Sequence, residues 1–232
     1  AVLAIVSAKV VFPLVKNHQK QKEFITSASH ELKTPLTVIH ADAQLLESEI
    51  GENAWLSDIL KQTTNMTEMT HKLVYLAQAE EQDNHFVKIE FPISDVAEDV
   101  ADPYRAVAQS KGKNYALEIQ KGFSYCGDEK AIREMMTALL DNAFKYSTEG
   151  GNIAVKLSAD GKGVRFTVEN TVSKIHPKQL ENFTARFYRT DTSDKIRGFG
   201  IGLSLAQVVA EAHKGKLTII LPKENVIQIS AI

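Results

Sequence analysis

Two long amphipathic helices are expected at the start of this chain, and they limit its possible folds more than any other feature. Apolar side chains recur there at steps of three and four residues, the spacing of one helical face. The first stripe comprises Phe24, Ala28, Leu32, Leu36, Ile39, Ala43 and Leu46, and the second comprises Leu56, Ile59, Leu60, Thr63, Met66, Met69, Leu73 and Leu76. With a turn at Gly51–Asn53, these stripes predict an antiparallel hairpin, which favours pairing with a second copy into a four-helix bundle.

His30 projects from the opposite side of the first predicted helix, beside Glu31 and one turn before Thr34. A neighbouring carboxylate can accept a hydrogen bond from an imidazole N–H, which fixes the tautomer and makes the other ring nitrogen more basic. Pro35 removes a backbone donor and is expected to bend or loosen the helix just past these residues. A lone histidine in such a place is more often an ordinary surface side chain.

The string SASHELKTPL, Ser27–Leu36, resembles the H box of bacterial sensor histidine kinases of two-component systems. In that family the histidine accepts the γ-phosphoryl group of ATP, the adjacent acid is the general base, and the threonine orients water for dephosphorylating the response regulator. The resemblance implies these roles for His30, Glu31 and Thr34. It also implies that residues 23–82 form a homodimeric phosphotransfer domain that docks the receiver domain of a response regulator.

Composition excludes several other classes of protein. The formal net charge of −2 over 232 residues gives no general attraction to nucleic acid, so no nucleic-acid partner is expected. One cysteine, Cys126, excludes an internal disulfide, and a buried, unreactive thiol is expected. The seven histidines lack the spacing of zinc ligands.

Residues 1–22 are expected to form a membrane-proximal segment. Their apolar runs, Ala1–Ala8 and Val10–Val15, are too short and broken for a complete membrane-spanning helix, and lysines follow them, as on the cytoplasmic side of a membrane exit. We interpret the segment as the tail of a last transmembrane helix, so that the rest is the cytoplasmic portion of a cell-membrane protein. The alternative is a cytosolic signalling helix that packs against its own copy.

A second domain, residues 83–232, is expected after the polar linker Gln82–His85, because the pattern there becomes mixed α/β. Ser94 is expected to cap a helix from Asp95 to about Ser110, which Gly112 ends. Strands or extended segments are predicted at Val87–Phe91, Tyr115–Gln120, Gly122–Cys126, Asn152–Ser158, Val164–Glu169, Lys216–Leu221 and Val226–Ile232.

A strongly periodic helix is predicted over Glu129–Tyr146, with Ala138 away from the centre of its buried face. That face comprises Ile132, Met135, Met136, Leu139, Leu140, Ala143 and Phe144. The string LLDNAFKYS within the helix resembles the N box of the same kinases, whose ATPase fold is shared with gyrase and with certain chaperone and mismatch-repair ATPases. The resemblance implies that Asn142 coordinates the Mg²⁺ that bridges the nucleotide phosphates, that Lys145 lies near the phosphates and that Tyr146 flanks the nucleotide. An amide oxygen is a reasonable Mg²⁺ ligand, and Ala138 stands where the family often has a further asparagine.

The segment VENTVSKI after the next strands corresponds to a degenerate G1 box. The family usually has an aspartate there that accepts the adenine amino group, followed by two glycines, and here Asn170, Val172 and Lys174 take these places. The side-chain oxygen of Asn170 can still accept that hydrogen bond without a charge. Because Val172 and Lys174 lack glycine's backbone freedom, we expect a rearranged or tighter adenine loop and weaker nucleotide affinity.

The string RFYRTD resembles the family's F box, with Phe187 as the aromatic residue and Arg189 as a phosphate or regulator contact. The short polar segment Thr192–Arg197 is a candidate lid over the nucleotide.

A glycine-rich run follows, with Gly198, Gly200 and Gly202 before a helix that starts at Leu203, ends at about His213 and is closed by Gly215. Glycines let backbone N–H groups approach phosphate oxygens, and a helix N-terminus adds a positive dipole. With the sequence that follows it, this run resembles the family's G2 box.

Together these features predict an α+β fold: a helical hairpin that forms a dimeric four-helix bundle, followed by an α/β sandwich of the GHKL (Bergerat) ATP-binding type. The predicted function is ATP- and Mg²⁺-dependent autophosphorylation of His30, transfer to an aspartate of a response regulator, and dephosphorylation of that regulator. The competing hypothesis is a phosphatase-biased or nucleotide-poor regulatory module, because of the degenerate adenine loop.

Overall fold

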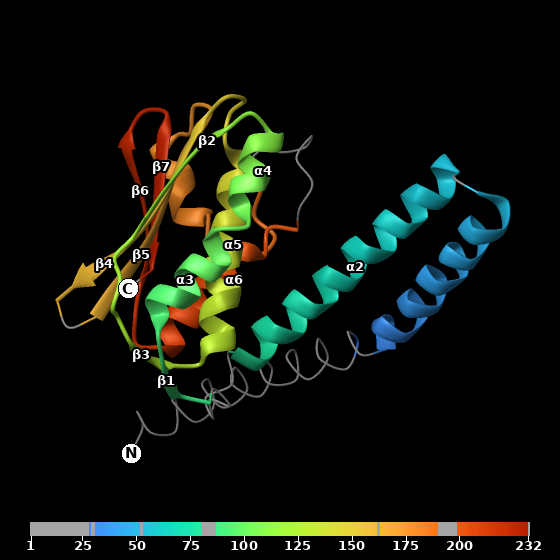
Figure 1. Cartoon of the computed structure of the whole chain (residues 1–232), viewed down its shortest axis with the longest axis horizontal. Helices are drawn as coiled ribbons and strands as arrows, with labels where there is room; N and C mark the ends of the chain where they lie inside the picture. Colours follow the sequence, from blue (N-terminus) through green and yellow to red (C-terminus); the bar gives the residue numbers. More distant parts are fainter. Residues whose placement is uncertain are drawn as a thin grey trace, which may run out of the picture. The chain divides into compact units, whose positions relative to one another are not determined.

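The computed structural model describes Ala28 and residues 31–51, 53–79, 87–161, 163–189 and 199–231. The chain divides into two compact units, Ala1–Glu81 and Gln82–Ile232. The first is helical and the second is α/β with a mixed sheet, so the predicted fold class is confirmed (Figure 1). Within the described ranges, no helix has both the length and the apolar character that crossing a membrane requires. Several predicted features lie outside the described residues, namely His30, Gly198, Phe24 of the first apolar stripe, the segment 1–22, the linker Gln82–His85 and the candidate lid Thr192–Arg197.

The described part of the first unit contains two helical segments, residues 31–50 and α2 (Ala54–Ala79), which form a hairpin (Figure 1). Gly51 ends the first segment with a left-handed backbone, φ +79°, and its N–H donates to the carbonyl of Glu47 at 2.9 Å. Asn53 caps the start of α2, because its Oδ1 accepts the N–H of Trp55 at 2.9 Å. The turn therefore lies where the sequence predicts it.

Each apolar stripe is only partly buried within one copy of the hairpin. Leu36, Ala43, Leu56 and Leu76 are buried. Large apolar side chains of the same helices stay exposed, namely Leu32, Val38, Ile39, Leu45, Leu46, Ile50, Trp55, Ile59 and Met66. So much exposed apolar surface on one element is typical of an interaction site.

A polar contact links the two helices of the hairpin. The Oγ1 of Thr63 donates to the carbonyl of Leu60 at 2.9 Å and lies 2.9 Å from Nδ1 of His40. Because the threonine hydrogen is already used, His40 must donate through Nδ1–H to the threonine oxygen. Thr63 is buried, so this contact favours one register between the helices.

The second unit is built on a five-stranded sheet in the order β2-β4-β5-β7-β6, with helices packed against one face (Figure 1). Only the pair β2–β4 is parallel, and the other neighbours are antiparallel. The strands are β2 (Asn114–Ile119), β4 (Asn152–Asp160), β5 (Gly163–Thr171), β6 (Leu217–Lys223) and β7 (Val226–Ala231). A separate antiparallel pair comprises β1 (Ile89–Phe91) and β3 (Tyr125–Gly127), so the strand predicted from Val87 begins two residues later.

The core lies between the helices and one face of the sheet. Side chains along β4 and β5 alternate between buried and more exposed positions, which is the pattern of a sheet covered on one side. The helices that cover it include α5 (Glu129–Tyr146) and α6 (Gly202–Ala212). Fully buried side chains from both layers include Met136, Leu139, Leu140, Ile153, Val155, Leu157, Phe166, Val168 and Leu205.

The buried face of α5 is wider than the sequence pattern indicates. Every position predicted to be buried is buried, and Ala138 is buried as well, contrary to the prediction. The reason is that α6 packs on that side: a Cβ added at Gly202 would lie 3.9 Å from the Cβ of Ala138.

The prediction of a single helix over residues 95–110 is wrong, because the structure has two helices in this region, α3 (Ile93–Ala101) and α4 (Tyr104–Ser110). Pro103 lies at the junction, where it has no N–H for the carbonyl four residues earlier and its ring would clash with that carbonyl. Gly112 ends α4 with a φ of +59°, as predicted.

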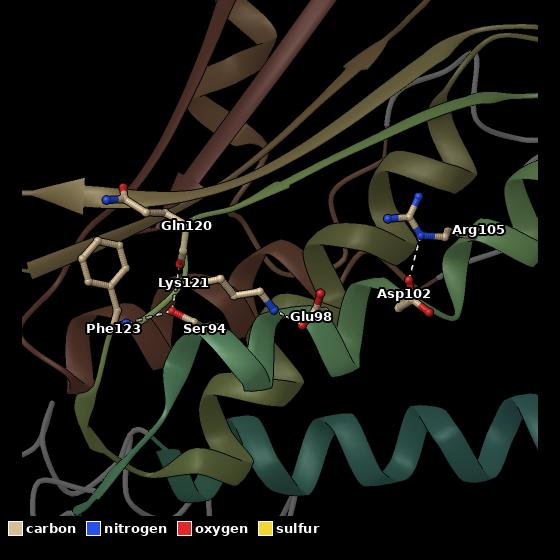
Figure 2. A network of polar contacts seen from close by, with 7 residues as sticks. All are labelled: Ser94, Glu98, Asp102, Arg105, Gln120, Lys121 and Phe123. Atoms are coloured by element: carbon tan, nitrogen blue, oxygen red, sulfur yellow. Dashed lines mark hydrogen bonds and ion pairs between the residues drawn. The ribbon is translucent and has the colours of Figure 1, made fainter.

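Ser94 is not the helix cap that the sequence predicts, since α3 already begins at Ile93. The buried Oγ of Ser94 donates to the carbonyl of Gln120 at 2.8 Å and accepts the N–H of Phe123 at 3.0 Å (Figure 2). An ion pair between Lys121 and Glu98 joins the same two segments. The side chain of Ser94 therefore connects α3 to the loop after β2 by hydrogen bonds.

Cys126 is exposed, so the prediction of a buried thiol is wrong. It lies in the middle of β3, opposite Glu90 of β1, and both side chains lie on the exposed side of this small sheet.

The end of α6 differs from the prediction in one residue. Lys214, not Gly215, takes the left-handed backbone conformation, with φ +62°. The N–H of Lys214 donates to the carbonyl of Glu211 at 2.9 Å, and the N–H of Gly215 donates to that of Ala210 at 2.8 Å. This is a Schellman motif, in which a glycine is usual at the place of Lys214.

Replacing Lys214→Gly is expected to raise the free energy of unfolding by about 1 kcal/mol, because glycine removes the steric cost of the left-handed conformation. Thermal unfolding of the full chain measures the change. The matched control is Lys214→Ala, which also removes the charge but keeps the Cβ. An equal gain in both variants would contradict the explanation by strain.

Candidate functional site

Two of the three residues predicted to act at the phospho-acceptor are described. Glu31 and Thr34 are exposed and lie one turn apart on the same helical segment, as the sequence predicts, and His30 immediately precedes this described stretch. The helix continues through Pro35, and the Oγ1 of Thr37 donates to the carbonyl of Lys33 at 2.8 Å across it. The side chains of Glu31 and Thr34 are therefore accessible to a partner or to solvent.

Asn170 lies in β5, between Ile153 of β4 and Ile227 of β7. It is only 2% exposed, and within the described part of the chain its buried Oδ1 has no hydrogen-bond partner. Its Nδ2 makes one long contact, 3.4 Å to the carbonyl of Thr171. A buried carbonyl oxygen without a partner costs roughly 1–3 kcal/mol. The oxygen therefore fits an external N–H donor such as the amino group of adenine.

The segment after Asn170 is held by the turn between β6 and β7. The N–H of Val172 donates to the carbonyl of Asn225 at 2.9 Å, and the side chain of Val172 is buried. Lys174 is exposed and forms an ion pair with Glu224 at 3.5 Å. Neither residue has a positive φ, so the chain follows ordinary backbone conformations where the family has glycines.

The last turns of α5 carry the three predicted N-box side chains. Asn142, Lys145 and Tyr146 are all half-buried, and the Nζ of Lys145 lies 5.2 Å from the centre of the Tyr146 ring. Burial raises the pKa of Tyr146, and the charge of Arg189 opposes this increase. The charge of Arg189, the predicted F-box arginine, therefore contributes to the electrostatic surroundings of Tyr146.

The start of α6 suits an anion. The helix begins at Gly202, followed by the buried Leu203, and no side-chain hydrogen bond caps its first turn. The hydroxyl of Ser204 donates instead to the carbonyl of Ile201 at 2.8 Å. Backbone N–H groups at an uncapped helix start can bind phosphate oxygens.

Gly200 has a packing role that the sequence pattern does not reveal. Its φ is +68°, and an added Cβ would lie 2.7 Å from both the carbonyl carbon of Phe187 and the carbonyl oxygen of Tyr188. The N–H of Phe187 donates to the carbonyl of Gly200 at 2.9 Å. Phe187 itself has a left-handed backbone, φ +62°, and its ring is 56% exposed. Gly200 therefore allows the F-box and G2-box backbones to lie against each other.

Two residues that hold α5 in place were missed from the sequence. Tyr104 of α4 donates its hydroxyl hydrogen to Oδ1 of Asp141, the residue before Asn142, at 2.6 Å. Burial is the main cause that raises the pKa of Tyr104, and the Asp141 carboxylate raises it further. Lys113 contacts the backbone just past Tyr146. Both contacts join residues distant in sequence, so no local pattern indicates them.

Comparison with known proteins defines the class. Residues 20–82 match the family described as His Kinase A (phospho-acceptor) domain, and residues 127–229 match the family described as Histidine kinase-, DNA gyrase B-, and HSP90-like ATPase. Both domains occur in one chain in this order, which is the organisation of an ATP-dependent histidine kinase. The chain belongs to the two-component sensor histidine kinases.

Relatives with known names agree with this assignment. The chain is 29% identical over 219 residues to sensor protein DltS of Streptococcus agalactiae serotype III (strain NEM316), covering 94% of this chain and 55% of DltS. It is 30% identical over 214 residues to the phosphate regulon sensor protein PhoR of Pseudomonas aeruginosa, covering 87% of this chain and 47% of PhoR. The chain thus spans about half the length of these relatives.

Solved structures share the fold. The crystal structure of full-length ShkA in complex with AMPPNP superposes with a TM-score of 0.74 at 21% identity, covering 90% of this chain and 45% of ShkA. Histidine kinase AdeS of Acinetobacter baumannii gives a TM-score of 0.63 at 19% identity, covering 87% of this chain and 96% of AdeS. The two family matches and the sensor-protein relatives do not favour the competing interpretation as a phosphatase-biased or nucleotide-poor regulatory module.

Replacing Gly200→Ala is expected to lower the free energy of unfolding by about 2 kcal/mol, because the new Cβ meets backbone atoms at a left-handed position. The matched control is Gly202→Ala, whose Cβ would make only an ordinary contact of 3.9 Å with Ala138. Thermal unfolding of the two variants measures the difference. Equal losses of stability would show that the close approach at Gly200 does not matter.

Proposed function

We propose that this chain autophosphorylates at His30 from ATP and passes the phosphoryl group to an aspartate in the receiver domain of a response regulator. The observation that carries the proposal is the buried Oδ1 of Asn170, which has no partner within the described residues of a domain that matches the ATPase family. An enzyme that binds adenine there would satisfy this oxygen through the adenine amino group.

The proposed nucleotide site follows from the residues around Asn170 and α5. Tyr146 flanks the nucleotide, while Lys145 and Arg189 supply positive charge near the phosphates. The backbone of the G2 box contacts the phosphates at Gly198, Gly200, Gly202 and Leu203. Asn142 contributes an amide oxygen to Mg²⁺, which is a ligand that this ion accepts beside phosphate and water. When bound, Mg²⁺ neutralises charge that develops on the transferring phosphoryl group.

The proposed reaction is an in-line displacement at the γ-phosphorus. One imidazole nitrogen of His30 forms the new N–P bond as the bond between the γ-phosphorus and the bridging oxygen breaks, and ADP leaves with the electron pair. Glu31 accepts the proton from the other ring nitrogen, which maintains the nucleophilicity of the imidazole. Thr34, exposed one turn later, is proposed to orient water for dephosphorylating the regulator.

The proposed partners follow from the hairpin. A second copy of the chain would bury the exposed apolar side chains described above and complete a four-helix bundle. Trp55 is the most exposed of them, at 81%. The receiver domain of the regulator is proposed to dock on this bundle, and residues 1–22 to connect it to a membrane.

Incubation with γ-labelled ATP and Mg²⁺ is expected to label the wild-type chain but not His30→Gln, because glutamine cannot form the phosphoimidazole. The matched control is His71→Gln, which removes an exposed histidine of α2 and should keep the label. An unlabelled wild-type chain would contradict the kinase function. Label on His30→Gln would contradict only the assignment of the acceptor.

Replacing Thr34→Ala is expected to slow dephosphorylation of a phosphorylated regulator about tenfold or more, while labelling of His30 is retained, because only the reaction with water needs this hydroxyl. Thr37→Ala is the control, since that hydroxyl donates to the carbonyl of Lys33. The measurement is loss of label from the regulator with time. Equal rates for wild type and Thr34→Ala would exclude this role.

A further inference from the structure

Lys113 lies outside every motif of the chain, in the turn between α4 and β2, yet it contacts the candidate nucleotide site. Its Nζ is 3.0 Å from the carbonyl oxygen of Ser147 and 2.9 Å from that of Thr148. These are the first two carbonyls after α5, which ends at Tyr146. The lysine therefore holds the backbone directly after the predicted N-box tyrosine.

The chemistry of this contact suits a lysine. Ser147 and Thr148 lie just beyond the helix, so their carbonyl oxygens have no partner within α5, and an ammonium group supplies several donors. Lys113 is half-buried. Burial is the main cause that lowers the pKa of its ammonium group, the positive charge of Lys111 lowers it further, and the negative charge of Glu149 opposes this decrease. Losing the side chain would leave both carbonyls without this donor.

The held segment also connects to the strand that carries Asn170. The N–H of Thr148 donates to the carbonyl of Thr171 at 3.1 Å, directly after Asn170. The N–H of Gly151 donates back to the carbonyl of Thr148 at 3.0 Å. A Cβ at Gly151 would lie 2.3 Å from Oγ1 of Thr171, so the turn packs tightly against the end of β5. One short hydrogen-bonded path thus joins Lys113 to both Tyr146 and Asn170.

We propose that Lys113 is a positioning residue for the nucleotide, holding the turn after α5 so that Tyr146 and Asn170 keep the separation that adenine requires. This inference rests on the proposed function, in which Asn170 contacts adenine and Tyr146 flanks the nucleotide. Lys113 itself need not contact the nucleotide.

A matched control lies at the other end of the same strand. Lys113 directly precedes β2, and Lys121 comes two residues after its end; the six extended residues of the strand span about 20 Å. Lys121 pairs with the carboxylate of Glu98 in the network that also holds Ser94 (Figure 2). Removing either lysine changes the net charge equally, but only one contact adjoins the candidate site.

The experiment measures ADP affinity of the full chain by calorimetry, below the unfolding temperature of every variant. Lys113→Met is expected to weaken ADP binding about tenfold, the effect of losing charged hydrogen bonds. Lys113→Arg, which can still donate to both carbonyls, should bind nearly as wild type, and Lys121→Met should bind as wild type. The loss in Lys113→Met should be equal with and without Mg²⁺, whereas Asn142→Ala should lose affinity only with Mg²⁺.

Unchanged ADP affinity in Lys113→Met, even with a lower unfolding temperature, would overturn the inference and leave the proposed function standing. An equal loss in Lys121→Met would also overturn it, because the effect would then be one of charge or general stability. A wild-type chain that binds no ADP would overturn the proposed function and this inference with it. If Lys113→Met does not fold, Lys113→Leu, which also lacks a donor, carries the same comparison.

Discussion

Burial of the apolar face of α5 between the sheet and α6 is the constraint on which the rest of the α/β unit depends. This helix places Met136, Leu139 and Leu140 against the core, which fixes its rotation about its own axis. Asn142 and Tyr146 then lie on the margin of the buried face, half-buried, where a side chain can contact both the interior and a ligand. The candidate nucleotide site is therefore a consequence of core packing, and the contacts of Tyr104 and Lys113 secure the end of the same helix.

The candidate site is also where local structural rules are broken. Asn170 buries an oxygen that has no partner in the described chain, Phe187 has a left-handed backbone, and α6 begins without a side-chain cap. Each of these costs free energy in the absence of a ligand. Under the proposed function, a nucleotide would supply a hydrogen-bond donor to Asn170 and an anion to the start of α6. The close contact of Gly200 with the backbone of Phe187 shows that a glycine-rich run serves packing within the protein as well as phosphate binding.

The hairpin depends on a different balance. Its two helices share a small buried seam and a polar contact between His40 and Thr63, while many large apolar side chains remain exposed. An element with so little buried surface is marginal alone, because hydrophobic burial must offset the entropy of ordering the chain. A partner copy would therefore contribute to the stability of the unit as well as to its function.

Periodicity alone determined the long helices, the turn at Gly51 and nearly all of the buried face of α5, because these follow from spacing within a few residues. Periodicity did not predict features that depend on segments distant in sequence. Ser94 forms hydrogen bonds with the loop after β2, and Ala138 is covered by α6. Cys126 lies on the exposed side of a small sheet. The break at Pro103 was readable from the sequence but was overlooked. The motifs resembling the H, N, F and G2 boxes indicated the family and its chemistry. Only the tertiary structure placed the carbonyls after α5 beside Lys113, and only it buried the Oδ1 of Asn170 away from any partner among the described residues, because such contacts join residues that no local pattern relates.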